Sequence, residues 1–316
     1  MFRLHRLRFH FSAAQPVHFP PGKAANVIRG ALGHAFRRVA CSPSCKGAVG
    51  CKTAIDCAYA RIFEPHALGE HPSGLADPPR PFVLRAAGLD GLHVAPGVGF
   101  SFGVNLLWPD PRAIAHFVLA LNDVAREGLG PGRGVVSLQR AVTLDAAGEV
   151  AGTVYEVAGT VYDDGRMRDG VAPKPVSISL EGEPGVRQIR VGFVTPTEVK
   201  SEGGSPGPEF GVLLARLRDR ISNLKALYQD GPLDIDFRAM GERAQRVRIV
   251  GSRLVRVETE RRSGRTGQVH PLGGFVGEAD YEGELGEFMG FLRVGELVGV
   301  GRQTVWGKGE IRVRTY

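Results

Sequence analysis

The sequence predicts an α+β protein built from two successive domains, each with strands and helices in the order β-α-β-β-α-β. Three observations lead to this fold class. The second half of the chain contains segments of strand and helix periodicity in that order, the first half divides in the same way, and Gly and Pro interrupt the chain between them at DGVAPKPV. We therefore expect an N-terminal domain over residues 1–170 and a C-terminal domain over residues 175–316, both ferredoxin-like.

The N-terminal domain is expected to begin with a strand at residues 2–11, where apolar residues alternate with cations and histidines. A helix with apolar residues at helical spacing follows at residues 22–39. The segment 150–163 contains AGTVY twice and is expected to form an added hairpin. The elements between them are, in order, strands at residues 82–85 and 99–107, a helix at 112–126 and a strand at 134–144.

The C-terminal domain is expected to begin with a strand at residues 186–194. An amphipathic helix follows at residues 209–228, with leucines and an isoleucine near one face. The remaining elements are, in order, strands at residues 246–260 and 273–285, a helix at 285–298, a glycine-rich loop at 299–309 and a strand at 309–316. RNA recognition motifs share this element order.

The composition is that of a globular protein with an excess of cations. The chain has 316 residues, 43% of them hydrophobic and 23% charged, and no apolar run approaches the length of a membrane span. The first residues lack the uninterrupted apolar stretch of a secretory signal, so we expect a cytoplasmic protein. The net charge of +7 would attract polyanions such as nucleic acid, although a generally basic surface is the alternative explanation.

The first helix is predicted to carry a cationic face. At about 100° per residue, its apolar residues form one stripe, and the opposite side gathers Lys23, Asn26, Gly30, His34 and Arg37. His34 could exchange a proton near neutral pH while the two cations hold an anionic substrate. The alternative is a basic face that contacts only solvent.

The four cysteines of the chain all lie in the segment 41–57, as Cys41, Cys45, Cys51 and Cys57. Four thiolates bind zinc tetrahedrally, and so short a loop has no core of its own, which favours a structural zinc site with these ligands. An iron-sulfur cluster uses the same ligands and is the second choice. Because four thiolates leave no open position for a substrate, a catalytic zinc is disfavoured.

The loop before the last strand reads VGVGRQTVWGKGE from Val298 to Glu310. Its glycine spacing fits neither the dinucleotide-binding fingerprint nor the phosphate-binding loop of NTPases. Its setting between a helix and the final strand of a ferredoxin-like domain indicates instead a loop that holds the phosphates of a polymer, with Arg302 and Lys308 supplying charge. Trp306 could stack on a base, but packing beneath the loop is its expected role.

Together, the basic charge, the two ferredoxin-like halves and the glycine-rich loop resemble the RAMP superfamily of CRISPR systems. The segments VGVGRQTVWGKGEI, PPGKAANVIRGALGHAFRR and the cysteine segment running into CAYARIFEP are similar to the pre-crRNA-processing endoribonucleases of that group, in particular its larger members with an N-terminal cysteine insert. The resemblance implies cleavage of CRISPR repeat RNA without a metal: the 2'-hydroxyl attacks the scissile phosphate and leaves a 2',3'-cyclic phosphate and a 5'-hydroxyl. Other CRISPR effector subunits are the further partners that it implies.

The resemblance also implies roles for individual residues. It makes His34 the leading general acid or base, with His18 in reserve, and Lys23 and Arg37 the groups that stabilise the developing charge. RNA binding falls to the glycine-rich loop and the first helix, at Gly299, Gly301, Arg302, Gly307, Lys308, Gly309, Arg29 and Arg38. Three alternatives stay open: arginines in place of a catalytic histidine, a non-catalytic RAMP subunit that binds guide RNA in an effector complex, and a zinc-stabilised DNA-binding module.

Overall fold

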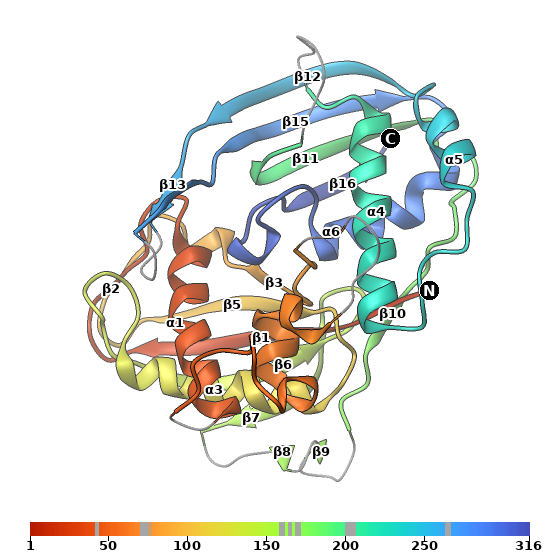
Figure 1. Cartoon of the computed structure of the whole chain (residues 1–316). Helices are drawn as coiled ribbons and strands as arrows, with labels where there is room; N and C mark the ends of the chain where they lie inside the picture. Colours follow the sequence, from red (N-terminus) through yellow and green to blue (C-terminus); the bar gives the residue numbers. More distant parts are fainter. Residues whose placement is uncertain are drawn as a thin grey trace. The chain divides into compact units, whose positions relative to one another are not determined.

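The computed structural model divides the chain into two compact units. The N-terminal unit comprises Arg3–Val176, and the C-terminal unit comprises Ser177–Tyr316 with Met1–Phe2. Each unit contains helices and an antiparallel sheet, so the protein is an α+β structure (Figure 1). The residues described are 1–41, 44–69, 75, 77–157, 162–163, 166–167, 172–199, 207–262 and 267–316.

The sheet of the N-terminal unit has its first strand, β1 (Phe2–Ala13), near the centre. Its strands follow the order β3-β5-β1-β6-β7, and each neighbouring pair is antiparallel. The other strands in this order are β3 (Phe82–Arg85), β5 (Gly99–Leu106), β6 (Val136–Leu144) and β7 (Val150–Glu156), and β10 (Val176–Ile178) pairs with β1 outside it. The first AGTVY copy lies in β7 and pairs with β6, whereas most of the second copy, at 158–161, lies outside the described residues.

Two helices of this unit, α1 (Ala24–Ala40) and α3 (Arg112–Glu127), pack against the sheet through aromatic rings. The ring centroid of Phe117 lies 5.3 Å from that of Phe36 on α1 and 5.8 Å from that of Phe82 on β3. These contacts make the core of the unit, and they fix which side of α1 faces away from it. The smaller elements are β2 (Val17–His18), α2 (Ala58–Phe63), β4 (His93–Val94), β8 (Tyr162–Asp163), β9 (Arg166–Met167) and β10 (Val176–Ile178).

The sheet of the C-terminal unit has the order β12-β15-β11-β16. Its core includes Phe210, whose ring centroid lies 5.4 Å from that of Tyr281 and 5.3 Å from that of Phe288. The elements are β11 (Gln188–Thr197), α4 (Phe210–Tyr228), α5 (Phe237–Ala244), β12 (Arg248–Val257), β13 (Glu260–Arg262), β14 (Val269–Pro271), β15 (Gly274–Glu282), α6 (Met289–Val298) and β16 (Ile311–Thr315). Within the described residues, no helix has the length and apolarity needed to cross a membrane.

Two features of the C-terminal unit differ from the prediction. Helix α5 was not expected from the sequence, although it begins with a recognisable cap: the Asp236 carboxylate accepts a hydrogen bond of 2.9 Å from the amide of Ala239. No element was expected between the predicted strands at residues 246–260 and 273–285, yet the ends of this segment pair as β13 and β14. Both elements are short, and short polar segments carry little periodicity to read.

Candidate functional site

The cationic face of α1 presents an exposed histidine between cations. Asn26, Gly30, His34 and Arg37 lie on successive turns of the helix, and Lys23 is the residue before its first turn. His34 is exposed, whereas Lys23 and Arg37 are half-buried. Among the described residues, none makes a hydrogen bond or ion pair with the side chains of Lys23, His34 or Arg37. These three groups are therefore available to a ligand.

Helix geometry places Arg37 and Lys23 at different distances from His34. At about 1.5 Å of rise per residue, Arg37 lies about 4.5 Å along the axis from His34, but Lys23 lies about 16 Å away. Arg37 and His34 can thus approach the same anionic group of a ligand. Lys23, at the other end of the helix, lies too far from His34 to share that group.

One of the two glycines of α1 makes room for a cation–π contact. The guanidinium carbon of Arg29 lies 5.3 Å from the ring centroid of Phe63 on α2. A Cβ on Gly33 would lie 3.3 Å from Arg29 Nη1 and 3.6 Å from Phe63 Cε1, so a side chain there would crowd the contact. A Cβ on Gly30 would meet nothing within 4 Å, which leaves the cationic face open beside His34.

Tyr59 on α2 is a polar group near this face that the prediction missed. Its hydroxyl donates to Glu64 Oε1 at 3.2 Å, and its ring stacks on Phe63 with centroids 5.5 Å apart. Burial, and then the charge and hydrogen bond of Glu64, raise the pKa of Tyr59 to about 12, while Arg37 and Arg29 act in the opposite direction. Tyr59 therefore stays protonated at neutral pH. The residue stands in the segment CAYARIFEP, but no spacing rule connects it to His34.

Arg38 was predicted to bind RNA, and the structure places it in ion pairs with α3. Its Nη2 lies 2.6 Å from Asp123 Oδ2 and 2.7 Å from Glu127 Oε1. The hydrogen bond that Arg38 donates to Asp123 is the main reason that the pKa of Arg38 is raised. A phosphate would have to compete with two carboxylates for this guanidinium.

The reserve histidine, His18, lies in β2 and stacks on a second histidine. The ring centroids of His18 and His93 are 4.0 Å apart with an interplanar angle of 18°, and the two residues face each other in the β2–β4 pair. His18 is half-buried and His93 is exposed. The stack restricts the orientation of the His18 ring, whereas the ring of His34 is exposed.

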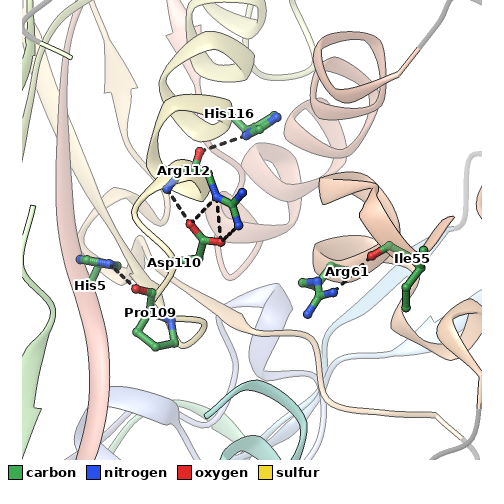
Figure 2. Close-up of polar contacts among 7 residues, drawn as sticks. All are labelled: His5, Ile55, Arg61, Pro109, Asp110, Arg112 and His116. Carbon is green, nitrogen blue, oxygen red and sulfur yellow. Dashed lines mark hydrogen bonds and ion pairs between the residues drawn. The ribbon is translucent and has the colours of Figure 1, made fainter. Parts of the chain in front are cut away.

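The turn that begins α3 is held by a dense set of polar contacts, drawn in Figure 2. The Asp110 carboxylate accepts from the backbone amide of Arg112 at 2.9 Å and from its guanidinium at 2.6 Å. Burial alone raises the pKa of Asp110, but these hydrogen bonds and the Arg112 charge outweigh it and hold the pKa below its usual value. Nε2 of His5, a residue only 1% exposed, lies 3.2 Å from Pro109 O.

Helix α2, which follows the four cysteines, contacts Trp108 next to this turn through Arg61. The guanidinium carbon of Arg61 lies 5.0 Å from the ring centroid of Trp108, and its Nη2 donates to Ile55 O at 3.2 Å. Figure 2 shows Arg61 beside Ile55, and His116 directed at the carbonyl of Arg112, 3.0 Å away. Arg61 thus links α2 to the turn before α3. None of these residues was selected from the sequence.

The four cysteines are free, half-buried thiols. Cys51 and Cys57 pack against a small apolar cluster of alanines, and the thiol of Cys45 exchanges a hydrogen bond with that of Cys41. In the part of the chain that the structure covers, no three His, Cys, Asp or Glu side chains gather closely enough to hold a metal ion. The donor set is typical of zinc, and a four-cysteine zinc site stays a prediction.

Two glycines of the glycine-rich loop allow close backbone packing against the end of β11. A Cβ on Gly301 would lie 2.4 Å from Glu198 O, and one on Gly309 would lie 1.9 Å from Val300 O. The amide of Gly309 donates to Pro196 O at 3.1 Å. Both glycines have positive φ, 78° and 71°. They are thus required by the fold of the loop itself, whatever the loop binds.

The remaining predicted residues of the loop differ in exposure. Lys308 is only 4% exposed, so its amino group does not present charge at the surface. The side chain of Arg302 is 63% exposed, and its Nη1 lies 3.9 Å from Glu198 Oε1. Of the two predicted cations of the loop, Arg302 is therefore the one at the surface. Trp306 is half-buried, and Gly299 and Gly307 have left-handed backbone.

On α4, Arg220 Nε donates to Val298 O at 3.0 Å, where α6 enters the loop.

Two family models match the chain. An N-terminal domain family matches residues 2–168, and the family described as CRISPR-associated endoribonuclease Cas6 matches residues 191–311. A comparison with curated proteins finds no match.

Several solved structures resemble the chain. A Cas6 product complex is similar over 99% of this chain and 100% of its own, with a TM-score of 0.57 and 19% identity. Thermus thermophilus Cas6 is similar over 99% of each chain, with a TM-score of 0.53 and 17% identity. A chain of a partial Cas6-RT-Cas1-Cas2 complex matches 100% of this chain with 46% of its own length, at a TM-score of 0.56 and 12% identity. At these identities the likeness is one of fold.

Proposed function

The chain is a Cas6-type RAMP protein of CRISPR systems, and from this premise we propose that it is an endoribonuclease that cleaves CRISPR repeat RNA without a metal. The observation that carries the proposal is His34 on α1, which is exposed, has no partner among the described residues and lies one turn from Arg37. A group that exchanges protons and a fixed positive charge are the two requirements of RNA transesterification.

In the proposed reaction, the 2'-oxygen loses its proton and bonds to the adjacent phosphorus, and the bond from phosphorus to the 5'-oxygen breaks. The products are a 2',3'-cyclic phosphate and a 5'-hydroxyl, which takes up a proton. His34 acts as general base or general acid in one of these transfers. Arg37 stabilises the charge that develops on the phosphorane, and Lys23 holds a neighbouring phosphate.

We propose that both units are ferredoxin-like and that the C-terminal one contacts RNA through its glycine-rich loop. The order of elements along each chain segment and the matching strand orders of the two sheets support the first part. For the second, the exposed Arg302 is the best-placed cation of the loop, and the left-handed glycines hold the backbone in tight turns. Lys308 is buried, so its predicted RNA contact would require the loop to rearrange.

Two further parts of the proposal concern partners. A structural zinc at Cys41, Cys45, Cys51 and Cys57 is supported by the donor set, and its binding would have to draw the Cys41–Cys45 pair toward the other two thiols. Association with other CRISPR proteins is supported by a fold neighbour described as part of a Cas6-RT-Cas1-Cas2 complex.

The proposed function is tested by incubating the purified protein with its cognate repeat RNA in EDTA and mapping the ends of the fragments. We expect one cut per repeat, with a 2',3'-cyclic phosphate on the upstream fragment. Cleavage that requires a divalent metal would overturn the proposed chemistry. Tight RNA binding without any cleavage would identify the chain as a non-catalytic guide-binding subunit instead.

A further inference from the structure

The face of the N-terminal sheet that points away from its core carries a group of cations. Along β1, Leu7, Phe9 and Phe11 are buried, while the residues between them, Arg8 and His10, are only half-buried. Successive side chains of a strand point to opposite faces, so Arg8 and His10 share the face opposite to the packed aromatic rings.

The strand register brings further cations to this face. His10 lies opposite Arg140 on β6 and opposite Ser101 on β5. Arg8 and Arg85 both lie opposite Gly103, one on each side of β5. Because Gly103 has no side chain, nothing on β5 separates the two arginines, and a Cβ there would lie 3.2 Å from Arg85 Cβ.

Among the described residues, no carboxylate forms an ion pair with Arg8 or Arg140 at the centre of this face. The side chain of Arg8 makes no hydrogen bond or ion pair with any described residue. Arg140 Nη2 donates to a neutral partner, Thr153 Oγ1, at 2.7 Å, and Arg6 Nη1 donates to the carbonyl of Asp145 at 2.6 Å. Glu156 is opposite Arg140 in the register, but within the described residues the two form no ion pair. Cations gathered without counter-charge repel one another, and a bound anion relieves that repulsion.

We propose that Arg8, His10 and Arg140 form a site on this sheet face that binds a phosphate of single-stranded RNA together with a proton. The inference deepens the proposed function, on which it rests for the identity of the polyanion. Small residues on β5, Gly99, Ser101 and Gly103, keep the surface beside His10 low enough for a sugar-phosphate backbone. The outward residues of β1, β5 and β6, all of them described, include no Phe, Tyr or Trp, so the site holds the backbone and does not stack bases.

The surroundings of His10 explain why the site would take up a proton when a phosphate binds. Burial, and then the charges of Arg8 and Arg140, lower the pKa of His10 from its ordinary 6.5. The ring is therefore neutral in the free protein at pH 7, and a phosphate beside it raises its pKa again. Protonation of His10 increases the RNA affinity fully when the pH is below the pKa of His10 in the free protein. This increase is lost as the pH rises through the pKa of His10 in the complex. The other charged residues on the neighbouring positions of these strands are Arg6, Arg85 and Glu156.

The test measures binding of a fluorescein-labelled ten-nucleotide oligouridylate to the full-length protein between pH 5.5 and 8.5, in series of salt concentrations. We expect affinity to rise as the pH falls. Arg8→Ala is expected to weaken binding roughly five- to tenfold at low salt and to reduce the slope of log affinity against log salt by about one. His10→Gln is expected to keep the salt slope and flatten the pH dependence. Arg126→Ala, which removes an exposed cation from α3 on the other side of the sheet, is the matched control.

Equal RNA affinity of wild type and Arg8→Ala would contradict the proposed phosphate site. A pH dependence that persists in His10→Gln would contradict proton uptake by His10. Inorganic phosphate, tested as competitor against chloride at equal ionic strength, separates the two sources of phosphate: full displacement at millimolar concentration would overturn RNA as the ligand. The same binding measured in His34→Ala keeps the two proposals apart. If the wild type cuts no repeat RNA yet shows the pH-linked binding, the proposed function fails and this site stands.

Discussion

Val300 and Gly309 close the neck of the glycine-rich loop: the amide of Val300 donates to Gly309 O at 2.9 Å. The carbonyl oxygen of Val300 lies 1.9 Å from where a Cβ on Gly309 would be. Any side chain at position 309 must therefore break this neck, so the loop has an architectural need for glycine that is separate from RNA.

Gly309→Ala is expected to destabilise the protein by at least about 2 kcal/mol, because the alanine adds both a backbone clash and a positive φ. The measurement is the unfolding free energy by denaturant titration. Gly185→Ala is the matched control, since Gly185 also has positive φ, 84°, but a Cβ there would meet nothing within 4 Å. That variant should lose only about 1 kcal/mol. Equal losses in the two variants would contradict the close approach.

His34→Ala is expected to slow cleavage of the repeat RNA on the order of 10²- to 10⁴-fold while leaving RNA affinity nearly unchanged, because it removes a proton-transfer group and no cation. Single-turnover kinetics with saturating enzyme measure the rate of the chemical step. His66→Ala removes another exposed histidine, from the turn at Pro65–Leu68, and should cleave normally. A His34→Ala rate equal to that of wild type would move the chemistry to another residue.

Lys23→Ala and Arg37→Ala are expected to fail in different ways, because the two cations lie at different distances from His34 along α1. Arg37→Ala should lower the single-turnover rate at saturation, since Arg37 shares a phosphate with His34. Lys23→Ala should weaken RNA binding and reduce the salt dependence by about one ion, with little change in the saturated rate. A loss of rate in Lys23→Ala as large as that in Arg37→Ala would show that the RNA brings both cations to one phosphate.

Zinc content is expected to follow the cysteines and to be independent of catalysis. Metal analysis of the purified protein should give about one zinc per chain, and Cys51→Ser with Cys57→Ser should abolish it. Iron with a visible absorption band would indicate the iron-sulfur alternative. If the protein is isolated without metal and is as stable as a zinc-reconstituted sample, the four thiols have no structural metal.

Asp110→Asn is expected to lower the Tm at pH 7 by a few degrees, because it removes the charge-assisted bonds from Arg112 at the start of α3. The folded-state pKa of Asp110 is lowered, so its stabilising effect is present above the ordinary value of 3.8 and disappears as the pH falls below it. Thermal unfolding of both proteins from pH 7 to pH 3 should show the two Tm curves converging at the acid end. Parallel curves would mean that Asp110 acts through its shape and not its charge.

Most of the regular elements could be predicted because their periodicity is strong. The strand at Phe82–Arg85 was predicted with its observed bounds, and α3 (Arg112–Glu127) was placed to within one residue. Helix α5 escaped prediction because its eight residues are too few to establish a pattern. The first strand extends to Ala13, two residues beyond its predicted end, because β5 and β6 provide partners for Ser12 and Ala13.

The candidate site was less accessible to sequence reasoning. The face of α1 with His34 follows from helical spacing alone. The partners of Arg38 and the burial of Lys308 do not, because they depend on residues far away in the chain: Asp123 binds Arg38 from a different helix. Tyr59 and Trp108 belong to segments without periodicity, so no pattern could connect them to α1.

The central position of β1 delays folding during synthesis. Phe9 pairs with Phe102 on one side and with Ala141 on the other, so β1 finds its second neighbour only after most of the N-terminal unit has been made. At typical elongation rates of about 5–20 residues per second, this wait is on the order of ten seconds. Until β5 has been made, β1 has no sheet partner in this unit, and its arginines and histidines help to keep the apolar strand from pairing with other nascent chains.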